Sequence, residues 1–301
     1  MNGNTWENLV VETQFATELT LTGLRRLCAV PTDPRLAPWG SNDLNYALHV
    51  GMYAYSSGLE RLCKLALACN RYASEGSFPN LRKYNHKVGS LLDAVEALTP
   101  MGPATSTHIA QHLKRPQDAL DPHLTDTVER FANGAGRYEH LDSLWNESAK
   151  VNTYNEWASL ASRASISEEV RRLIPIRDAM TDALGSEIVH SGLEATGERV
   201  MEDLSLPTYE PSVGVVLSLF RKVRWVSTIL DVATYYTSPD LPILGEVVSP
   251  TFIHPSTDFF KFSIARIGDE EIVAEELRDA YGRIRAREAD EDESISPWSD
   301  E

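Results

Sequence analysis

Residues 42–72, NDLNYALHVGMYAYSSGLERLCKLALACNRY, decide the fold. No proline interrupts this stretch, and its apolar residues recur in steps of three and four, which is the period of an amphipathic helix. Ser41 or Asn42 can cap its start. Gly51 and Gly58 lie seven residues apart on one face. Because each costs about 1 kcal/mol of helix propensity, they predict a close contact with another helix.

The sequence around this helix predicts a helical hairpin. Residues 74–79, SEGSFP, form a break, and a second helix is expected to start between Asn80 and Asn85 and to end at Leu98. Two long antiparallel helices joined by a short turn are typical of half a bundle. Upstream, residues 31–41 hold three prolines and form a loop or linker. Further helices are expected at about 104–113, 123–135, 138–149 and 153–163, and from Ser167 onward.

The C-terminal part of the chain is less regular. Residues 211–236 are apolar, but their valine and aromatic content leaves helix and strand open. Residues 247–266 carry the strongest strand signal, and residues 269–285 have the pattern of an amphipathic helix. Residues 288–301 carry seven acids and no base, which predicts a disordered tail.

These patterns predict a mainly α fold, a helical bundle with additional helices and a small β element near the C-terminus. We expect four regions along the chain. They are an N-terminal segment and linker at 1–40, a helical domain at 41–165, a mostly helical region at 166–287 and the acidic tail at 288–301.

Composition excludes several classes of protein. The formal net charge of −16 argues against sequence-independent coating of nucleic acid and against a polybasic membrane anchor. The N-terminus has no secretory signal pattern, and the longest apolar stretches are far shorter than the ~20 residues that cross a bilayer. We therefore expect a cytoplasmic protein with no membrane partner. The three cysteines form no CxxC pair, and no metal or cofactor is expected.

One segment runs against the acidic background. Residues 61–92 contain six bases and one acid, a local charge of +5. A concentrated positive patch can attract a polyanion, whereas the alternative interpretation is an ordinary pair of solvated helix faces. The bases are Arg61, Lys64, Arg71, Arg82, Lys83 and Lys87, and the acid is Glu75.

His86 is the candidate for chemistry in this segment. A histidine can act as general acid or base near neutral pH, and a neighbouring cation can stabilise the charge on a reacting phosphate. A lone histidine is also often structural. Glu60 and Lys64 are spaced i,i+4, which first suggests a helix-stabilising ion pair worth ~0.2–0.5 kcal/mol and second a role in a site.

Two segments of the chain and the break between them resemble HEPN domains. The segments are GLERLCK at 58–64 and KYNHKVGSLL at 83–92, and the break contains Phe78 and Pro79. RYEHLDSLW at 137–145 is similar to a downstream segment of some bacterial members. The resemblance covers about residues 42–145. It implies a helical bundle, a homodimer and metal-independent cleavage of RNA in bacterial defence or toxin–antitoxin systems.

The resemblance also implies a set of site residues. His86 matches the family's histidine. Three residues separate Arg82 from His86, where the family has four to six, so either Arg82, one helical turn away, or Arg137, from another helix, would supply the cation. The candidate substrate-binding residues are Lys83, Asn85, Lys87, Lys64, Glu60 and His140.

The sequence therefore leaves two functions open. The first is a HEPN-like RNA- or nucleotide-binding protein, cleaving RNA through attack of a 2′-hydroxyl on the adjacent phosphate. The alternative is a non-catalytic helical module that dimerises or docks a protein partner through its helical surface.

Overall fold

The computed structural model describes residues 3–33, 41–98, 112–117, 119–134, 136–146, 153–166, 168, 171, 210–235 and 240–248. These residues are mainly helical and contain no strand, so the prediction of a mainly α fold is confirmed. Most of the expected strand at 247–266 lies outside the described residues, and its first two residues end a short helix, α11 (Gly245–Val248).

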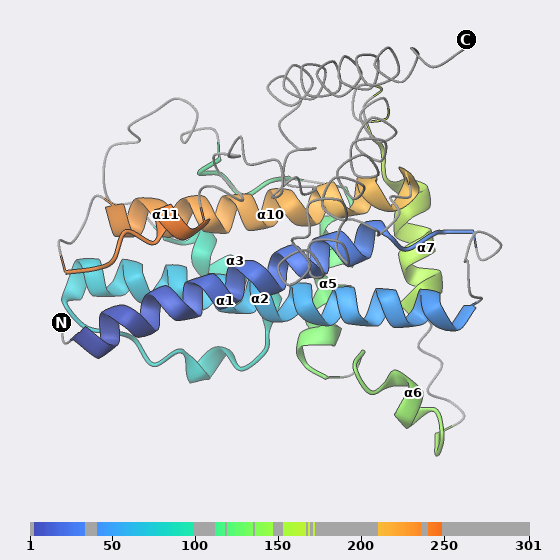
Figure 1. Cartoon of the computed structure of the whole chain (residues 1–301), viewed down its shortest axis with the longest axis horizontal. Coiled ribbons are helices and arrows are strands. Elements are labelled where there is room, and N and C mark those ends of the chain that lie inside the picture. Colours follow the sequence, from blue (N-terminus) through green and yellow to red (C-terminus); the bar gives the residue numbers. More distant parts are fainter. Residues whose placement is uncertain are drawn as a thin grey trace, which may run out of the picture.

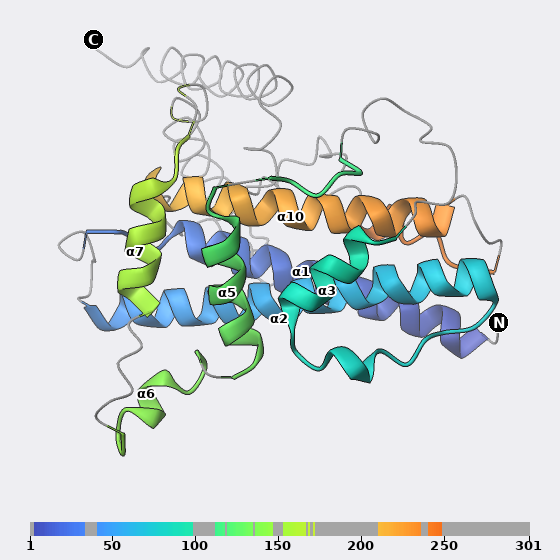
Figure 2. The ribbon, with the colours of Figure 1, turned by 180° about the vertical axis from the view of Figure 1, so that it is seen from behind.

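Three long helices run alongside one another through the molecule (Figure 1). They are α1 (Gly3–Cys28), α2 (Ser41–Glu75) and α10 (Glu210–Tyr235). Shorter helices pack across them on the side seen in Figure 2, namely α3 (Val88–Glu96), α5 (Asp121–Ala132) and α7 (Thr153–Arg163). The predicted helices at 123–135 and 153–163 correspond to α5 and α7. Of the one expected at 138–149, residues 138–146 are described and contain a single helical turn, α6 (Glu139–Asp142).

Close packing of α1 on α2 confirms the contact predicted from the two glycines of α2. A Cβ placed on Gly58 would lie 2.7 Å from the backbone nitrogen of Thr20, and one on Gly51 would lie 2.9 Å from Leu27 Cγ. The N-terminal segment thus contributes a long helix to the bundle. On α1, Gly23 plays the same part as the two glycines of α2, since a Cβ placed on it would lie 2.5 Å from the backbone nitrogen of Tyr55.

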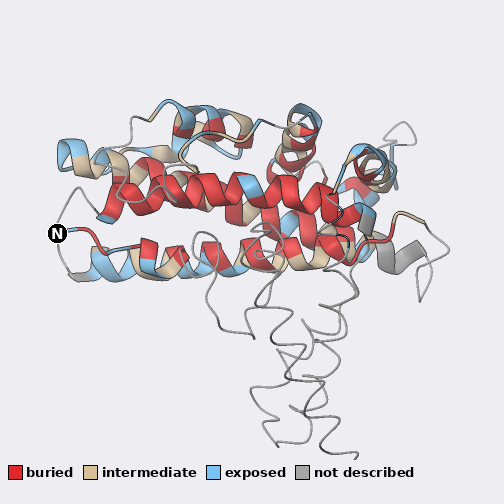
Figure 3. Cartoon of the chain, turned by 90° about the horizontal axis from the view of Figure 1, so that it is seen from above, coloured by how far each residue is buried: buried red, intermediate tan, exposed pale blue. Residues whose placement is uncertain are grey.

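The choice between helix and strand that the sequence left open for residues 211–236 is resolved by α10, which is a helix. Its sequence lacks amphipathic periodicity because the helix is buried on nearly every face. Tyr55 of α2 donates a hydrogen bond from Oη to the carbonyl oxygen of Leu219 in α10 (2.9 Å). Buried residues are concentrated where the long helices face one another (Figure 3). Residues from α1, α2 and α10 share one hydrophobic core, while the division at 40/41 and 165/166 stays a prediction.

The second arm of the hairpin differs from its prediction. A 3₁₀ turn, η2 (Leu81–Tyr84), precedes α3, and residues 85–87 separate the two. The Asn80 side chain accepts a hydrogen bond from the Arg82 backbone N–H (3.0 Å), and Asn85 has a positive φ of 47° that ends the turn. His86 therefore lies in a connection, and the expectation that Arg82 and His86 share one face of a continuous helix is wrong.

The remaining predicted elements fall largely outside the described residues. These are the helices at 104–113, from Ser167 and at 269–285, and the tail at 288–301. Within the described part of the chain, no helix has the length and apolar character needed to cross a membrane.

Candidate functional site

A single carboxylate organises the candidate site. Glu60 is buried on α2, and its Oε1 accepts a hydrogen bond from Lys64 Nζ (2.6 Å), one helical turn further along the same face. The other oxygen, Oε2, lies 3.0 Å from Nδ1 of His86. The ion pair predicted at Glu60 and Lys64 thus also holds the histidine, which comes from the connection between η2 and α3.

This arrangement leaves the second ring nitrogen of His86 unused by Glu60. A carboxylate that accepts a hydrogen bond from Nδ1 fixes the orientation of the imidazole and leaves Nε2 for proton transfer. The His86 side chain is 58% exposed, so solvent and ligands reach the ring. The pairing therefore has the geometry of an oriented general acid or base.

Lys64 also ties the His86 connection to α2. Its Nζ donates a second hydrogen bond, to the backbone carbonyl of Asn85 (3.0 Å). An ammonium group has three donors, so one remains for a ligand. The positive φ of Asn85 occurs at this anchored residue, where the chain turns to bring His86 over Glu60.

These groups line a pocket of about 440 Å³. Three cationic side chains and two carboxylates line it, which gives a formal charge of +1 when His86 is neutral and +2 when it is protonated. A small positive pocket in a chain of charge −16 concentrates the attraction for an anion at one place. The lining residues are Glu12, Tyr53, Ser57, Glu60, Arg61, Lys64, Leu65, Ala68, Leu81, His86 and Arg137.

Arg137 reaches this pocket from the segment after α5. Its Nε donates to the carbonyl of Phe131 (2.7 Å) and its Nη2 to that of Ala132 (3.2 Å), which ties the guanidinium to the last turn of α5. Its Cζ lies 4.4 Å from the ring centroid of Tyr53 on α2, a cation–π contact. Two of the three predicted catalytic residues, His86 and Arg137, therefore share one pocket.

Three of the predicted basic site residues, Arg82, Lys83 and Lys87, lie outside the pocket. Arg82 is exposed in η2 and does not line the pocket. Lys83 lies over the Tyr84 ring, with Nζ 4.9 Å from its centroid, and Lys87 is exposed outside the pocket. Acids also neutralise part of the cluster at 61–92, since Arg61 pairs with Glu12 and Arg71 pairs with Glu75 (2.5 Å).

His140 belongs to a separate cluster. Its ring centroid lies 4.8 Å from that of His49, and His49 Nε2 lies 3.6 Å from Oε2 of the buried Glu139. None of these three residues lines the His86 pocket. Among the described residues, no group of three or more histidine, cysteine or acidic side chains is placed to hold a metal ion.

The pocket contains residues that the sequence analysis missed. Tyr53 and Ser57 precede Glu60 by seven and three positions on α2, a helical spacing that places all three on one side. That spacing could have indicated Tyr53 and Ser57 as neighbours of Glu60 from the sequence alone. Glu12 had no such signal, because it reaches the pocket from α1 through tertiary packing and its ion pair with Arg61.

The geometry places an oriented imidazole beside the Lys64 ammonium group, in an open, slightly positive pocket that Arg61 and Arg137 also line, which suits the binding of a phosphate diester. Comparison of the chain with protein-family models, with curated proteins and with solved structures gives no match.

Proposed function

We propose that this chain binds RNA at the pocket around Glu60, Lys64 and His86 and cleaves it without a metal ion. The observation that carries the proposal is the hydrogen bond between His86 Nδ1 and the Glu60 carboxylate (3.0 Å), which leaves an exposed imidazole edge beside the Lys64 ammonium group. The HEPN-like segments support it, because they contribute Glu60, Lys64 and His86. The dimer and the setting in bacterial defence or toxin–antitoxin systems are further parts of this proposal and rest on the resemblance.

The proposed reaction uses groups of the chain and solvent water. His86 accepts the proton of a ribose 2′-hydroxyl, whose oxygen attacks the adjacent phosphorus. The bond from phosphorus to the 5′-oxygen of the next nucleotide breaks, this oxygen takes a proton from a solvent water, and His86 then returns the 2′-hydroxyl proton to solvent. The products are a 2′,3′-cyclic phosphate and a free 5′-hydroxyl. Lys64 stabilises the added negative charge on the phosphate oxygens, while Arg137 adds positive charge further along the same pocket. The need for a 2′-hydroxyl restricts the substrate to RNA.

Removal of the imidazole tests this function. Wild-type and His86→Ala protein are incubated with total RNA and with tRNA in a metal chelator, and the fragments are analysed for cyclic phosphate ends. General acid–base catalysis contributes about 10²–10⁴-fold, so the variant should cleave slower by that factor. Equal cleavage by both proteins, or none by the wild type, would remove the ribonuclease proposal.

A second function has its own supporting observation. Leu144 and Trp145 are 80% and 84% exposed beside α6, and Tyr138 and Leu141 are also exposed. Apolar side chains gathered on a surface segment are typical of docking sites, which favours the non-catalytic module that binds a protein partner. The two functions separate in one assay, because Trp145→Ser should leave RNA cleavage unchanged and weaken only association with a protein.

A further inference from the structure

We infer that Tyr53 and Arg137 form a stacking platform for one unpaired RNA base, in the same pocket that holds the phosphate at Lys64 and His86. This inference rests on the proposed function and specifies the form of RNA that the pocket takes. The two residues come from separate elements, α2 and the segment after α5, and both line the pocket.

The Arg137 guanidinium packs on the Tyr53 ring. The guanidinium carbon of Arg137 lies 4.4 Å from the centroid of the Tyr53 ring, so a planar cation covers one face of an aromatic ring. Two hydrogen bonds to the carbonyls of Phe131 and Ala132 hold the guanidinium in place. Ordered aromatic rings and arginine planes are the surfaces on which unpaired RNA bases stack.

The pair formed by Tyr53 and Arg137 is accessible to solvent. Tyr53 is 46% exposed although Arg137 covers one face, so the pair presents a partly open surface to solvent. Among the described residues, no carboxylate forms an ion pair with Arg137, in contrast to Arg61 and Lys64 in the same pocket. Its charge therefore remains available to attract the RNA backbone while its plane contributes to stacking.

The platform lies at a distance from the phosphate site along α2. Tyr53 precedes Glu60 by seven residues on α2, which is about 10 Å along the helix axis. The stacking surface and the His86–Lys64 site thus lie at two positions along one pocket, an arrangement that suits a flexible single strand. A duplex keeps its bases stacked inside the helix and cannot place one on the platform.

Affinity for a non-cleavable probe tests the platform separately from cleavage. The probe is a short single-stranded 2′-O-methyl oligoribonucleotide, which lacks the attacking hydroxyl, and a second set of probes carries one abasic position moved stepwise along the strand. Stacking of one base changes affinity by about 5- to 150-fold. Wild-type protein should lose that factor at one abasic position, and it should bind the matching duplex no better than the worst abasic probe.

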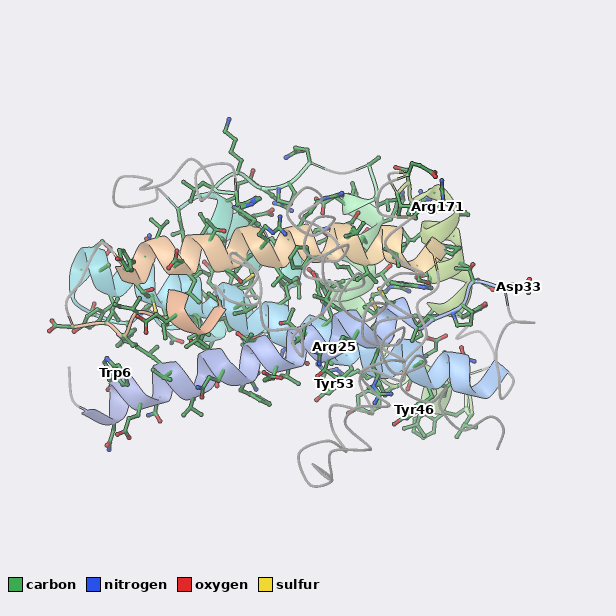
Figure 4. The ribbon with its side chains drawn as sticks, turned by 45° about the horizontal axis from the view of Figure 1, so that its top comes forward. Trp6, Arg25, Asp33, Tyr46, Tyr53 and Arg171 are labelled. Carbon is green, nitrogen blue, oxygen red and sulfur yellow. The ribbon has the colours of Figure 1, made fainter. Side chains whose placement is uncertain are left out.

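Variants at Tyr53 identify the surface responsible. Tyr53→Leu should weaken binding of the intact probe by the same 5- to 150-fold and should no longer distinguish it from the abasic probes, whereas Tyr53→Phe should bind as the wild type does. Trp6→Leu is the matched control, because Trp6 is also 46% exposed, lies near the start of α1 in Figure 4 and does not line the pocket. Far-UV circular dichroism checks that each variant is folded.

The results distinguish a failure of the stacking platform from a failure of the proposed RNA binding. If the wild type binds the probe but Tyr53→Leu binds it equally well, the platform is wrong and the phosphate site stands. If the wild type binds neither single-stranded nor duplex RNA, both the proposed function and the platform are wrong.

Discussion

At the scale of single residues, the Glu60 carboxylate serves two partners at once. It balances the charge of Lys64 and orients His86, with contacts of 2.6 Å and 3.0 Å. A buried carboxylate that loses its charge holds both partners less strongly, because hydrogen bonds to a charged acceptor are the stronger ones. Glu60 is therefore a positioning residue in this account, and its effect on cleavage should act through His86.

Glu60→Gln should lower the rate of RNA cleavage by about tenfold or more while RNA affinity stays equal or rises. The rate falls because a neutral amide orients His86 less well, and affinity holds because the pocket gains one unit of net positive charge. Single-turnover cleavage and equilibrium binding of the 2′-O-methyl probe measure the two effects. A purely structural role for Glu60 would instead lower both together.

Buried ionisable groups predict the response to alkaline conditions. Burial raises the pKa of Cys69 from 9.0 to about 12, and it also raises the pKa of Tyr55 well above 10.0. Both groups are neutral when protonated, so the unfolded chain releases their protons at a lower pH than the folded chain does. The stability linked to Cys69 is fully present below pH 9 and is lost as the pH rises toward 12.

The free energy of unfolding should thus fall above pH 9, by about 1.4 kcal/mol per pH unit for each such group. Urea unfolding at several alkaline pH values measures this slope. Cys69→Ala should make the slope shallower between pH 9 and 12, after allowance for the lost methylene and sulfur packing. An identical slope in the variant would show that Cys69 does not titrate differently in the two states.

At the scale of elements, the contact between α1 and α2 depends on glycines that allow the backbones to approach. A Cβ on Gly58 would meet the backbone nitrogen of Thr20 at 2.7 Å and the carbonyl oxygen of Ala16 at 2.9 Å. Backbone atoms cannot yield as a side chain can. The nearest contacts of a Cβ on Gly51 are with the Leu27 side chain, at 2.9 and 3.0 Å, which has room to adjust.

Gly58→Ala should therefore destabilise the protein by about 1–2 kcal/mol, because overpacking costs ~1–3 kcal/mol and the gain in helix propensity returns at most ~1 kcal/mol. Gly51→Ala should cost less. Thermal or urea unfolding of the two variants measures the difference. Equal or greater stability of Gly58→Ala would mean that α1 does not pack on α2 as closely as described.

Some of the helices could be predicted from the sequence and others could not. α2 and α7 were predictable because their apolar periodicity and flanking breaks are local signals. α10 was left undecided because a helix buried all round has no amphipathic pattern. The turn at Asn85 could not be predicted, since its carbonyl is anchored by Lys64, a contact made across the fold.

The candidate site was likewise predictable in part, where local sequence signals indicated its residues. Glu60, Lys64 and His86 stood out from motif and charge, and Arg137 was one of two open alternatives for the cation. Arg82 lies outside the pocket because the 3₁₀ turn breaks the helix that would have aligned it with His86. The pairing of Arg137 with Tyr53 depends on how α5 crosses α2, which no local pattern reports.

At the scale of the whole molecule, the three long helices share one hydrophobic core with α3, α5, α7 and α11. Trp157 of α7 and Trp225 of α10 both belong to it, together with residues of α1 and α2. We expect the described bundle to unfold in a single transition, with tryptophan fluorescence and far-UV circular dichroism giving the same urea midpoint. Two separated transitions would instead indicate that the regions at 41–165 and 166–287 fold independently.

In the proposed function, RNA binds at the pocket between α2, the His86 connection and Arg137. The most direct measurement is photocrosslinking of wild-type protein to a single-stranded 2′-O-methyl oligoribonucleotide that carries 4-thiouridine, followed by mass spectrometry of the crosslinked peptides. RNA bound at this pocket should give crosslinks within residues 53–64 and 81–87 or at Arg137, and an unlabelled single strand should compete them away. Crosslinks confined to other parts of the chain would contradict binding at this pocket.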